Sequence, residues 1–377
     1  MTKAFRWAVV AAIALTPALT AITAARADVA NNASATNVQQ GDNKASTNQS
    51  GTSKSGDAVA GQVAGVVSSG TTSVNATNKS DHVDISTGDA RGSNSSNAFV
   101  GLNSSTSTAI GAADILNGTK APVTNLQEGD NKYDLNQTLT ATSGDGVGGE
   151  VIGVVTSAGG SASVVAANTS TNVDISTGDA RAFNDAAAFV GLNSSSDTSV
   201  ANPGASDVLN AASATNVQEG DNKLSANQSA TTKSGDGVGG QVLGVVSAGA
   251  ASVDATNLSD HVDISTGDAR SGNDFASFVG LNAATDTSVA AADVLNGAAA
   301  TNVQEGDNSK NLMQDASATS GDSVAGQVAG VVTSAGGSAD LVLANTSTNS
   351  DTSSGSGRFF NSDASFTGLT VSPGINV

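Results

Sequence analysis

Residues able to support catalysis are few in this 377-residue sequence, and they do not recur as catalytic groups would. Its two histidines, His82 and His261, occupy equivalent positions of an internal repeat, where two other copies carry Asn172 and Asn349. A general base must be present wherever the reaction takes place, so a base replaced in alternate copies does not fit that role. The sequence has no nucleophile elbow, zinc signature or phosphate-binding loop. We therefore expect a protein that is not an enzyme and has no catalytic residue.

Aspartates near recurring Gly-Asp steps suggest a second kind of chemistry, calcium binding. Calcium takes several hard oxygen ligands, often from one loop. The sequence lacks both the EF-hand loop and the glycine-rich nonapeptide of calcium-binding β-rolls. Aspartate in such steps also caps turns through its own backbone, which is a purely structural role. The calcium candidates are Asp84, Asp89, Asp263 and Asp268, and we expect no other cofactor.

The most informative motif is a set of Gln, Gly, Asn and a second Gln that keeps one spacing in four copies. A strand, a tight turn and a second strand would set the two glutamines on facing arms, because Gly, Asp and Asn suit such turns. Equivalent amides of stacked copies would then form side-chain ladders, as in cross-β structures. The amides predicted to form ladders and to take part in assembly are Gln39, Asn43, Gln49, Gln127, Asn131, Gln137, Gln218, Asn222, Gln228, Gln304, Asn308 and Gln314.

This spacing resembles the curlin repeat of curli-type functional amyloids, in which Gln, Gly, Asn and a second Gln occur in the same order. It is also similar to the Asn- and Gln-rich repeats of other secreted amyloid adhesins. The motif departs from the curlin pattern: one residue is missing between Gly and Asn, and the following alanine is kept only at Ala45. The resemblance implies an extracellular protein that assembles. The other interpretation is that the amides form ladders only inside a monomer.

The motif marks four copies of one long unit, which recur at intervals of 88, 91 and 86 residues. Copies one and three share SDHVDISTGDAR, and copies two and four share ANTSTN, so alternate copies are the closer relatives. The fourth copy loses the STGDAR and AFVGLN strings, which is typical of a capping unit. The chain is divided into a signal peptide at 1–27 and repeats at 28–118, 119–209, 210–295 and 296–377, the last a degenerate C-terminal cap.

Short alternating runs rich in Val, separated by Gly-Asp and Asn-rich corners, predict strands and turns. Only 3% of the residues are aromatic, so any buried layer must consist of small side chains. We expect an all-β solenoid, a stack of short strands. The alternative is four tandem small β-sandwich domains, which usually bury more large side chains. Four arginines are expected to pair with an Asp of a neighbouring coil: Arg91, Arg181, Arg270 and Arg358.

The N-terminal segment has the pattern of a secretory signal, with Lys3 and Arg6 before an apolar run and a small-residue site at Ala27. Removal of residues 1–27 leaves 12 basic and 34 acidic residues, a net charge of −22, which argues against nucleic-acid partners. The rest of the sequence has no apolar run long enough to span a membrane. It has no cysteine, so neither disulfides nor thiolate–metal bonds stabilise it.

Two functions fit these observations. The first is a secreted structural or adhesive protein of the cell surface or extracellular matrix, which self-associates or binds other matrix components and can form amyloid-like fibres. The second is a monomeric β-solenoid that presents polar rows to a polysaccharide or another surface, with calcium as a stabiliser. Both place the protein outside the cell.

Overall fold

The structure is a computed structural model of the whole chain. The predicted signal peptide lies outside the residues that the structure describes. Among the described residues, no helix is long and apolar enough to cross a membrane. The described residues are 29–30, 35–105, 108–110, 115–116, 121–156, 161–195, 198–201, 208–284, 287–290, 295–333, 337–368, 370–371 and 375–376.

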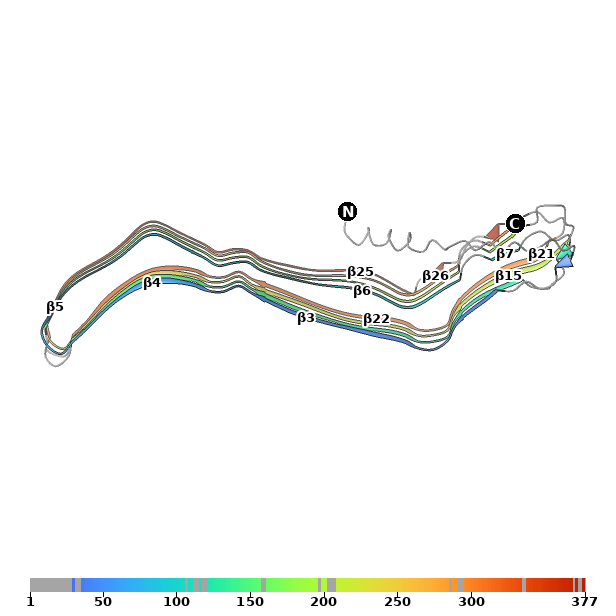
Figure 1. The fold of residues 1–377 in the computed structure, drawn as a ribbon, viewed down its shortest axis with the longest axis horizontal. Coiled ribbons are helices and arrows are strands. Elements are labelled where there is room, and N and C mark those ends of the chain that lie inside the picture. Colours follow the sequence, from blue (N-terminus) through green and yellow to red (C-terminus); the bar gives the residue numbers. More distant parts are fainter. Residues whose placement is uncertain are drawn as a thin grey trace.

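Each repeat forms one long coil, and the four coils stack with their strands in parallel (Figure 1). Coil 1 contains β2 (Ala35–Gln39), β3 (Asn43–Lys54), β4 (Ala58–Ser68), β5 (Thr72–Ser86), β6 (Ala90–Ser105) and β7 (Thr108–Ile110). Coil 2 contains β9 (Ala121–Gln127), β10 (Asn131–Thr142), β11 (Gly146–Thr156), β12 (Ala162–Ser176), β13 (Ala180–Ser195) and β14 (Thr198–Ala201).

Coils 3 and 4 repeat this order of strands. Coil 3 contains β15 (Val208–Gln218), β16 (Asn222–Lys233), β17 (Gly237–Ser247), β18 (Ala251–Ser265), β19 (Ala269–Ala284) and β20 (Thr287–Ala290). Coil 4 contains β21 (Leu295–Gln304), β22 (Asn308–Thr319), β23 (Ser323–Thr333), β24 (Ala339–Ser353), β25 (Gly357–Thr367), β26 (Thr370–Val371) and β27 (Ile375–Asn376). Two short strands, β1 (Val29–Ala30) and β8 (Ile115–Leu116), also pair.

Equivalent strands of the four coils form six parallel sheets, here called A to F in chain order. The register matches the sequence repeats residue by residue: Asn131 lies between Asn43 and Asn222 in sheet B. This shared set of sheets confirms the predicted β-solenoid. The tandem-sandwich alternative is wrong, because no repeat keeps its strands within a domain of its own. Sheet A contains β1, β2, β8, β9, β15 and β21; sheet B β3, β10, β16 and β22; sheet C β4, β11, β17 and β23; sheet D β5, β12, β18 and β24; sheet E β6, β13, β19, β25 and β26; and sheet F β7, β14, β20 and β27.

The coil is flat and consists of two layers (Figure 1). Sheets A, B and C follow one another along the first layer, and the chain turns back between β4 and β5 to run along the second. Sheet C packs on sheet D, and sheet B packs on sheet E. A Gly-Asp corner separates sheet B from C and another separates D from E, so these steps bend a layer and do not join facing strands.

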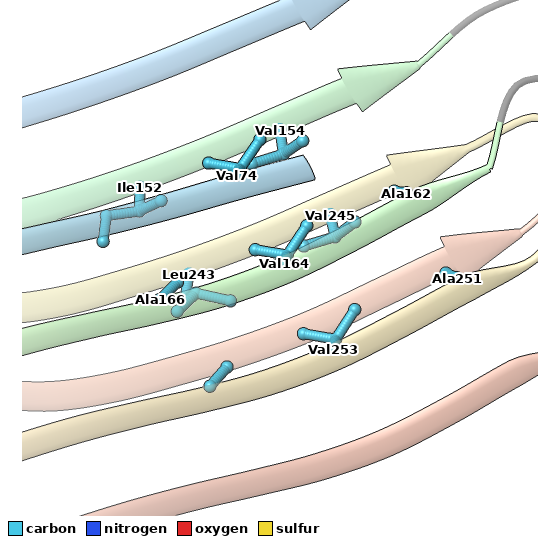
Figure 2. Close-up of a cluster of buried hydrophobic side chains, with 11 residues drawn as sticks. Val74, Ile152, Val154, Ala162, Val164, Ala166, Leu243, Val245, Ala251 and Val253 are labelled. Carbon is cyan, nitrogen blue, oxygen red and sulfur yellow. The ribbon is translucent and has the colours of Figure 1, made fainter. Parts of the chain in front are cut away.

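The core is the single layer of side chains between the two sheets of each pair. Along β11 and β16 every second residue is buried, the period of a strand with one face inward. Between sheets C and D, Val154 lies beside Val74, and Val245 beside Val164 (Figure 2). Large side chains are concentrated in the inner coils: Ile152 and Leu243 are each 1% exposed, whereas coils 1 and 4 carry alanine at this position.

Truncating an inner-coil side chain should therefore cost more than truncating an outward one. Ile152→Ala leaves a cavity between sheets C and D and should lower the free energy of unfolding by about 2–5 kcal/mol. Val165→Ala, on the outer face of sheet D, should change it by less than about 1 kcal/mol. Urea denaturation followed by circular dichroism measures both. Equal losses for the two variants would contradict this assignment of the core.

Candidate functional site: amide ladders and Gly-Asp corners

The second glutamine of the motif forms a ladder through sheet B. Gln137 Nε2 donates to Gln49 Oε1 at 2.6 Å, and Gln228 donates to Gln137 at 2.8 Å. Gln314 Nε2 continues the ladder and donates to Gln228 Oε1 at 2.8 Å. Each amide therefore donates to the preceding coil, which gives the ladder a direction. Gln137 and Gln228 are completely buried, so these bonds satisfy groups that water cannot reach.

The asparagines of the motif form a second ladder with the opposite direction. Asn43 Nδ2 donates to Asn131 Oδ1 at 2.9 Å, Asn131 to Asn222 at 2.8 Å, and Asn222 to Asn308 at 2.7 Å. Here each amide donates to the following coil. The stack consequently has two different ends, one with Asn43 Oδ1 and one with Asn308 Nδ2.

The first glutamine of the motif binds the other half of the coil. Gln218 Nε2 donates to Gln127 Oε1 at 3.2 Å. Gln127 Nε2 also donates to the backbone oxygen of Gly101 at 3.4 Å, and Gln304 does the same to Gly280. These bonds connect sheet A to the Gly-Leu-Asn segment within sheet E.

Gly101 and Asn131 fit together so closely that only glycine is possible there. Gly101 has φ of +68°, and a Cβ at this position would lie 1.7 Å from Asn131 Oδ1. Gly191 meets Asn222 in the same way at the next coil, with 1.6 Å. The glycine of the AFVGLN string and the asparagine of the amide motif are thus two parts of one contact, although they lie in separate strings of the sequence.

The two glutamines of each copy do not lie on facing arms, so that expectation is wrong. Gln39 belongs to sheet A and Gln49 to sheet B, and these sheets follow one another in one layer (Figure 1). The reason is that the Gly-Asp-Asn step between them continues the layer through a corner and does not reverse the chain.

Three further amide columns were not singled out from the sequence. Asn168 links Asn78 and Asn257 at 3.1 and 3.0 Å in sheet D, and sheets E and C have comparable columns. The signal was available, because an amide recurs at the same place in nearly every repeat. The members of these columns are Asn78, Asn168, Asn257 and Asn345; Asn94, Asn184, Asn273 and Asn361; and Gln62, Glu150, Gln241 and Gln327.

The aspartates of the Gly-Asp corners join one coil to the next. Asp57 Oδ1 accepts the backbone N–H of Asp145 at 3.0 Å, and Asp145 accepts that of Asp236 at 2.9 Å. Asp89 and Asp179 do the same in the third corner, at 2.9 Å. This hydrogen bond is the first cause that lowers the pKa of the Asp89 carboxyl. The corners are therefore backbone-to-carboxylate bridges between coils.

The arginines pair within their own coil, so the expected pairing with a neighbouring coil is wrong. Arg181 contacts Asp179 at 2.6 Å and Arg270 contacts Asp268 at 2.7 Å; Arg91 pairs with Asp89. The other oxygen of each aspartate is engaged by the next coil, which leaves the near oxygen for the arginine two residues away. Arg358 has Ser356 in place of the aspartate.

The four calcium candidates do not meet in one site. Asp89 and Asp268 are engaged by an arginine and by the next coil. Asp84 and Asp263 instead lie on either side of Asp174 in sheet D. Burial, followed by the charges of these two neighbours, raises the pKa of Asp174. In the part of the chain that the structure describes, no group of three or more His, Asp or Glu residues is arranged to hold a metal ion.

The alternating histidines and asparagines have a backbone role. His82, Asn172, His261 and Asn349 have φ between 50° and 56°, and the strand pairing skips each of them. They form a kink that all four strands of sheet D share at the same position. Asn and His are among the non-glycine residues that enter this left-handed region most readily, which explains why only these two types alternate here.

A cavity of about 480 Å³ runs through all four coils between sheets C and D. Its lining includes the Gln62 column, in which coil 2 alone has a carboxylate, Glu150. Glu150 is 1% exposed; its Oε2 accepts Gln241 Nε2 at 3.1 Å, whereas Oε1 has no partner among the described residues. Burial raises the pKa of Glu150.

No protein-family model, curated protein or solved structure matches this chain. The assignment of a function therefore depends on the geometry of the chain itself.

The left-handed position of sheet D should tolerate asparagine and reject alanine. His261→Ala places a residue without a stabilising side chain in the left-handed region and should lower the free energy of unfolding by about 1–2 kcal/mol. His261→Asn carries the residue of coils 2 and 4 and should leave stability nearly unchanged, because the contact of His261 with Asp260 that it removes is exposed. Chemical denaturation of the two variants tests this, and a loss for asparagine equal to that for alanine would refute the backbone role.

Glu150→Gln should stabilise the protein at neutral pH. The variant removes a buried charge and restores the amide of the other coils, a gain of about 1–3 kcal/mol. Because the pKa of Glu150 is raised in the fold, the parent protein recovers this stability as the pH falls and the carboxyl becomes protonated. The difference between the two proteins should therefore close toward low pH. Denaturation at pH 7 and pH 4 measures it, and a difference independent of pH would show that the charge is not its cause.

Proposed function

We propose that this chain is a secreted structural protein of the cell surface or extracellular matrix, whose copies stack end to end into fibres. One observation carries the proposal. Coils 1 and 4 leave long strands at the edges of sheets B to E, from β3–β6 and from β22–β25, of 11 to 16 residues each. A long unprotected edge strand is a template for pairing with another chain.

The edges lack proline, one of the features that prevent such pairing. None of the four prolines, at 17, 122, 203 and 373, falls in these eight strands. Coil 4 differs in sequence from the other repeats, which predicted a capping role. Its strands β22–β25 nevertheless pair with coil 3 and present the same kind of edge as coil 1.

The two ends of the stack are complementary. Amides in sheet B donate in both directions along the stack. Asn308 at the coil 4 end is therefore positioned to donate to Asn43 of a second copy, and Gln49 of that copy is positioned to donate to Gln314. Coils 2 and 4 are close relatives, as are coils 1 and 3. A junction of coil 4 with coil 1 of a second copy therefore repeats the observed junction of coil 2 with coil 3.

Contacts between two different surfaces of one molecule generate open filaments when they do not close into a ring. Stacking through parallel in-register strands and amide ladders is the arrangement of cross-β fibres. This supports a fibre-forming extracellular role, in agreement with the resemblance to curlin repeats. The signal peptide and the surface location remain predictions from the sequence.

A monomeric binding module for polysaccharide is the second candidate. Its support is the outer column of Phe99, Phe189, Phe278 and Phe366 on sheet E, whose rings stack with centroids 4.8 to 5.3 Å apart. Phe99 and Phe366 are more than half exposed. Aromatic faces of this kind suit the apolar faces of sugar rings, but one column is narrow for a binding surface.

Proline substitutions in the edge strand β3 distinguish the fibre-forming function from the polysaccharide-binding function. The N–H of Asn43 in β3 points to coil 2, where it donates to Asp130 O at 2.7 Å. Successive N–H groups of a strand alternate in direction, so those of Ser46 and Ser50 point away from coil 2. The chain with Ser46→Pro and Ser50→Pro should therefore keep its fold and lose the ability to elongate.

Electron microscopy and a cross-β dye should show fibres for the mature parent and none for the double variant. The matched control is Thr47→Pro, which removes an N–H directed at coil 2 and should instead destabilise the fold by about 3 kcal/mol or more. A parent protein that stays monomeric at high concentration and binds a polysaccharide would favour the second candidate and end the assembly proposal.

A further inference from the structure

The outer face of sheet C is apolar in all four coils. Outward positions of β4 read Val59, Gly61, Val63, Gly65 and Val67, and the same order Val-Gly-Val-Gly-Val recurs in β11, β17 and β23. The twelve valines of this face, called here the valine–glycine face, are between 37% and 84% exposed. They form three ridges along the stack, and a groove lined by glycine separates each ridge from the next.

This face is more uniform than the buried face of the same strands. The inward position next to Val63 holds Ala64 in coil 1, Ile152 in coil 2, Leu243 in coil 3 and Ala329 in coil 4. The outward positions show no such variation in any coil. Packing inside the protein explains only the column of Gly61, where a Cβ would lie 2.8 Å from the backbone oxygen of Gly149. It does not explain the identical valines or the column of Gly65, whereas a contact outside the protein can.

Strand formation alone does not require these valines either. Outward positions on the neighbouring sheet B are polar, as at Ser46, Asn48 and Thr52, and sheet D carries Asn75 and Thr77 outward. Those strands form equally well with polar outer residues. Sheet E carries one outward phenylalanine column, but among sheets B to E only sheet C has an outer face without polar side chains.

We infer that the valine–glycine face pairs with the same face of a second copy. The ridges of one copy fit the grooves of the other when the two faces are shifted by one column, so the surface is complementary to itself. The face carries no charge, in a chain whose mature charge is −22, and thus offers a place where two copies can meet without direct repulsion. Interdigitated small side chains of this kind form the dry interface between paired sheets.

The size of the face agrees with such a contact. With the usual rise per residue and strand spacing, it measures ~27 Å along the strands and ~19 Å across four coils. Pairing would bury ~1,000 Å² in total, near the lower limit for a specific interface. One pair of chains should therefore associate weakly, and each added copy in a fibre should strengthen the pairing. The inference does not depend on end-to-end stacking, since the contact is lateral.

The glycine groove provides a sharp test. A Cβ at Gly65, Gly153 or Gly244 would meet no atom within 4 Å, and the same holds for Gly330. Valine at these four positions therefore fits the single chain, but it fills the groove that the partner's ridge must enter. The added valines also make the face more apolar. Unspecific hydrophobic association between chains would therefore become stronger, whereas association by interdigitation would become weaker.

Sedimentation velocity should be measured on the Ser46→Pro, Ser50→Pro chain, in which head-to-tail elongation is blocked. Variants of the face itself then distinguish a lateral dimer from one formed by two coil 4 edges. We expect a dimer whose dissociation constant rises at least about tenfold when the groove is filled, the fold-change that corresponds to 1.4 kcal/mol. Threonine in place of Val63, Val151, Val242 and Val328 should weaken it similarly. The matched control adds valine to sheet B, at Thr52, Thr140, Thr231 and Ser317, and should leave the dimer unchanged.

Three results would overturn the inference. They are a monomeric parent at all concentrations, stronger association after the groove is filled, and binding to neutral phosphatidylcholine vesicles without a dimer. Circular dichroism confirms that each variant keeps its strands. In the chain without the two prolines, fibres one stack wide would refute lateral pairing and leave end-to-end stacking intact. Dimers without fibres would refute end-to-end stacking and leave lateral pairing intact.

Discussion

Parallel pairing of whole repeats in one register is the constraint on which this structure depends. Neighbouring strands in a sheet lie ~4.8 Å apart, so every side chain has its own counterpart from the next repeat directly above and below it. Groups that bind their own kind gain from this arrangement: amides donate to amides, and phenylalanines stack. Groups that repel their own kind require a separate solution.

The acidic residues show how that solution works. At the Gly-Asp corners of coils 1 to 3 each carboxylate accepts a backbone N–H of the next coil and, in the third corner, also pairs with an arginine of its own coil. Asp84, Asp174 and Asp263 lie in register in sheet D. Burial, together with the charges of its two neighbours, raises the pKa of Asp174. Glu150 avoids the problem differently, because its neighbours in the column are glutamines. The chain thus carries a high charge while its repeats stay aligned.

The same constraint gives the molecule two unlike surfaces for self-association. Its ends present backbone edges and directional amides, which favour a polar head-to-tail contact. Its valine–glycine face presents ridges and grooves without charge, which favour a lateral contact between two stacks. Both surfaces are produced by repetition, since a column exists only where four coils carry equivalent residues. A fibre assembled through both contacts would extend the architecture that each chain already has.

The sequence by itself determined the all-β solenoid and the amides that stack, because identical strings at equal spacing can satisfy one another only in register. It could not determine the path of the coil. Whether a Gly-Asp step reverses the chain or bends a layer depends on which sheet packs opposite. The packing of sheet B on sheet E makes the step a bend, so Gln39 and Gln49 lie in one layer. The tertiary structure also decided that Gly101 must accommodate Asn131, that Arg181 pairs within its own coil, and that the valines of sheet C face outward. Alternation shows that a strand has two faces, but only packing against sheet D fixes which one is buried.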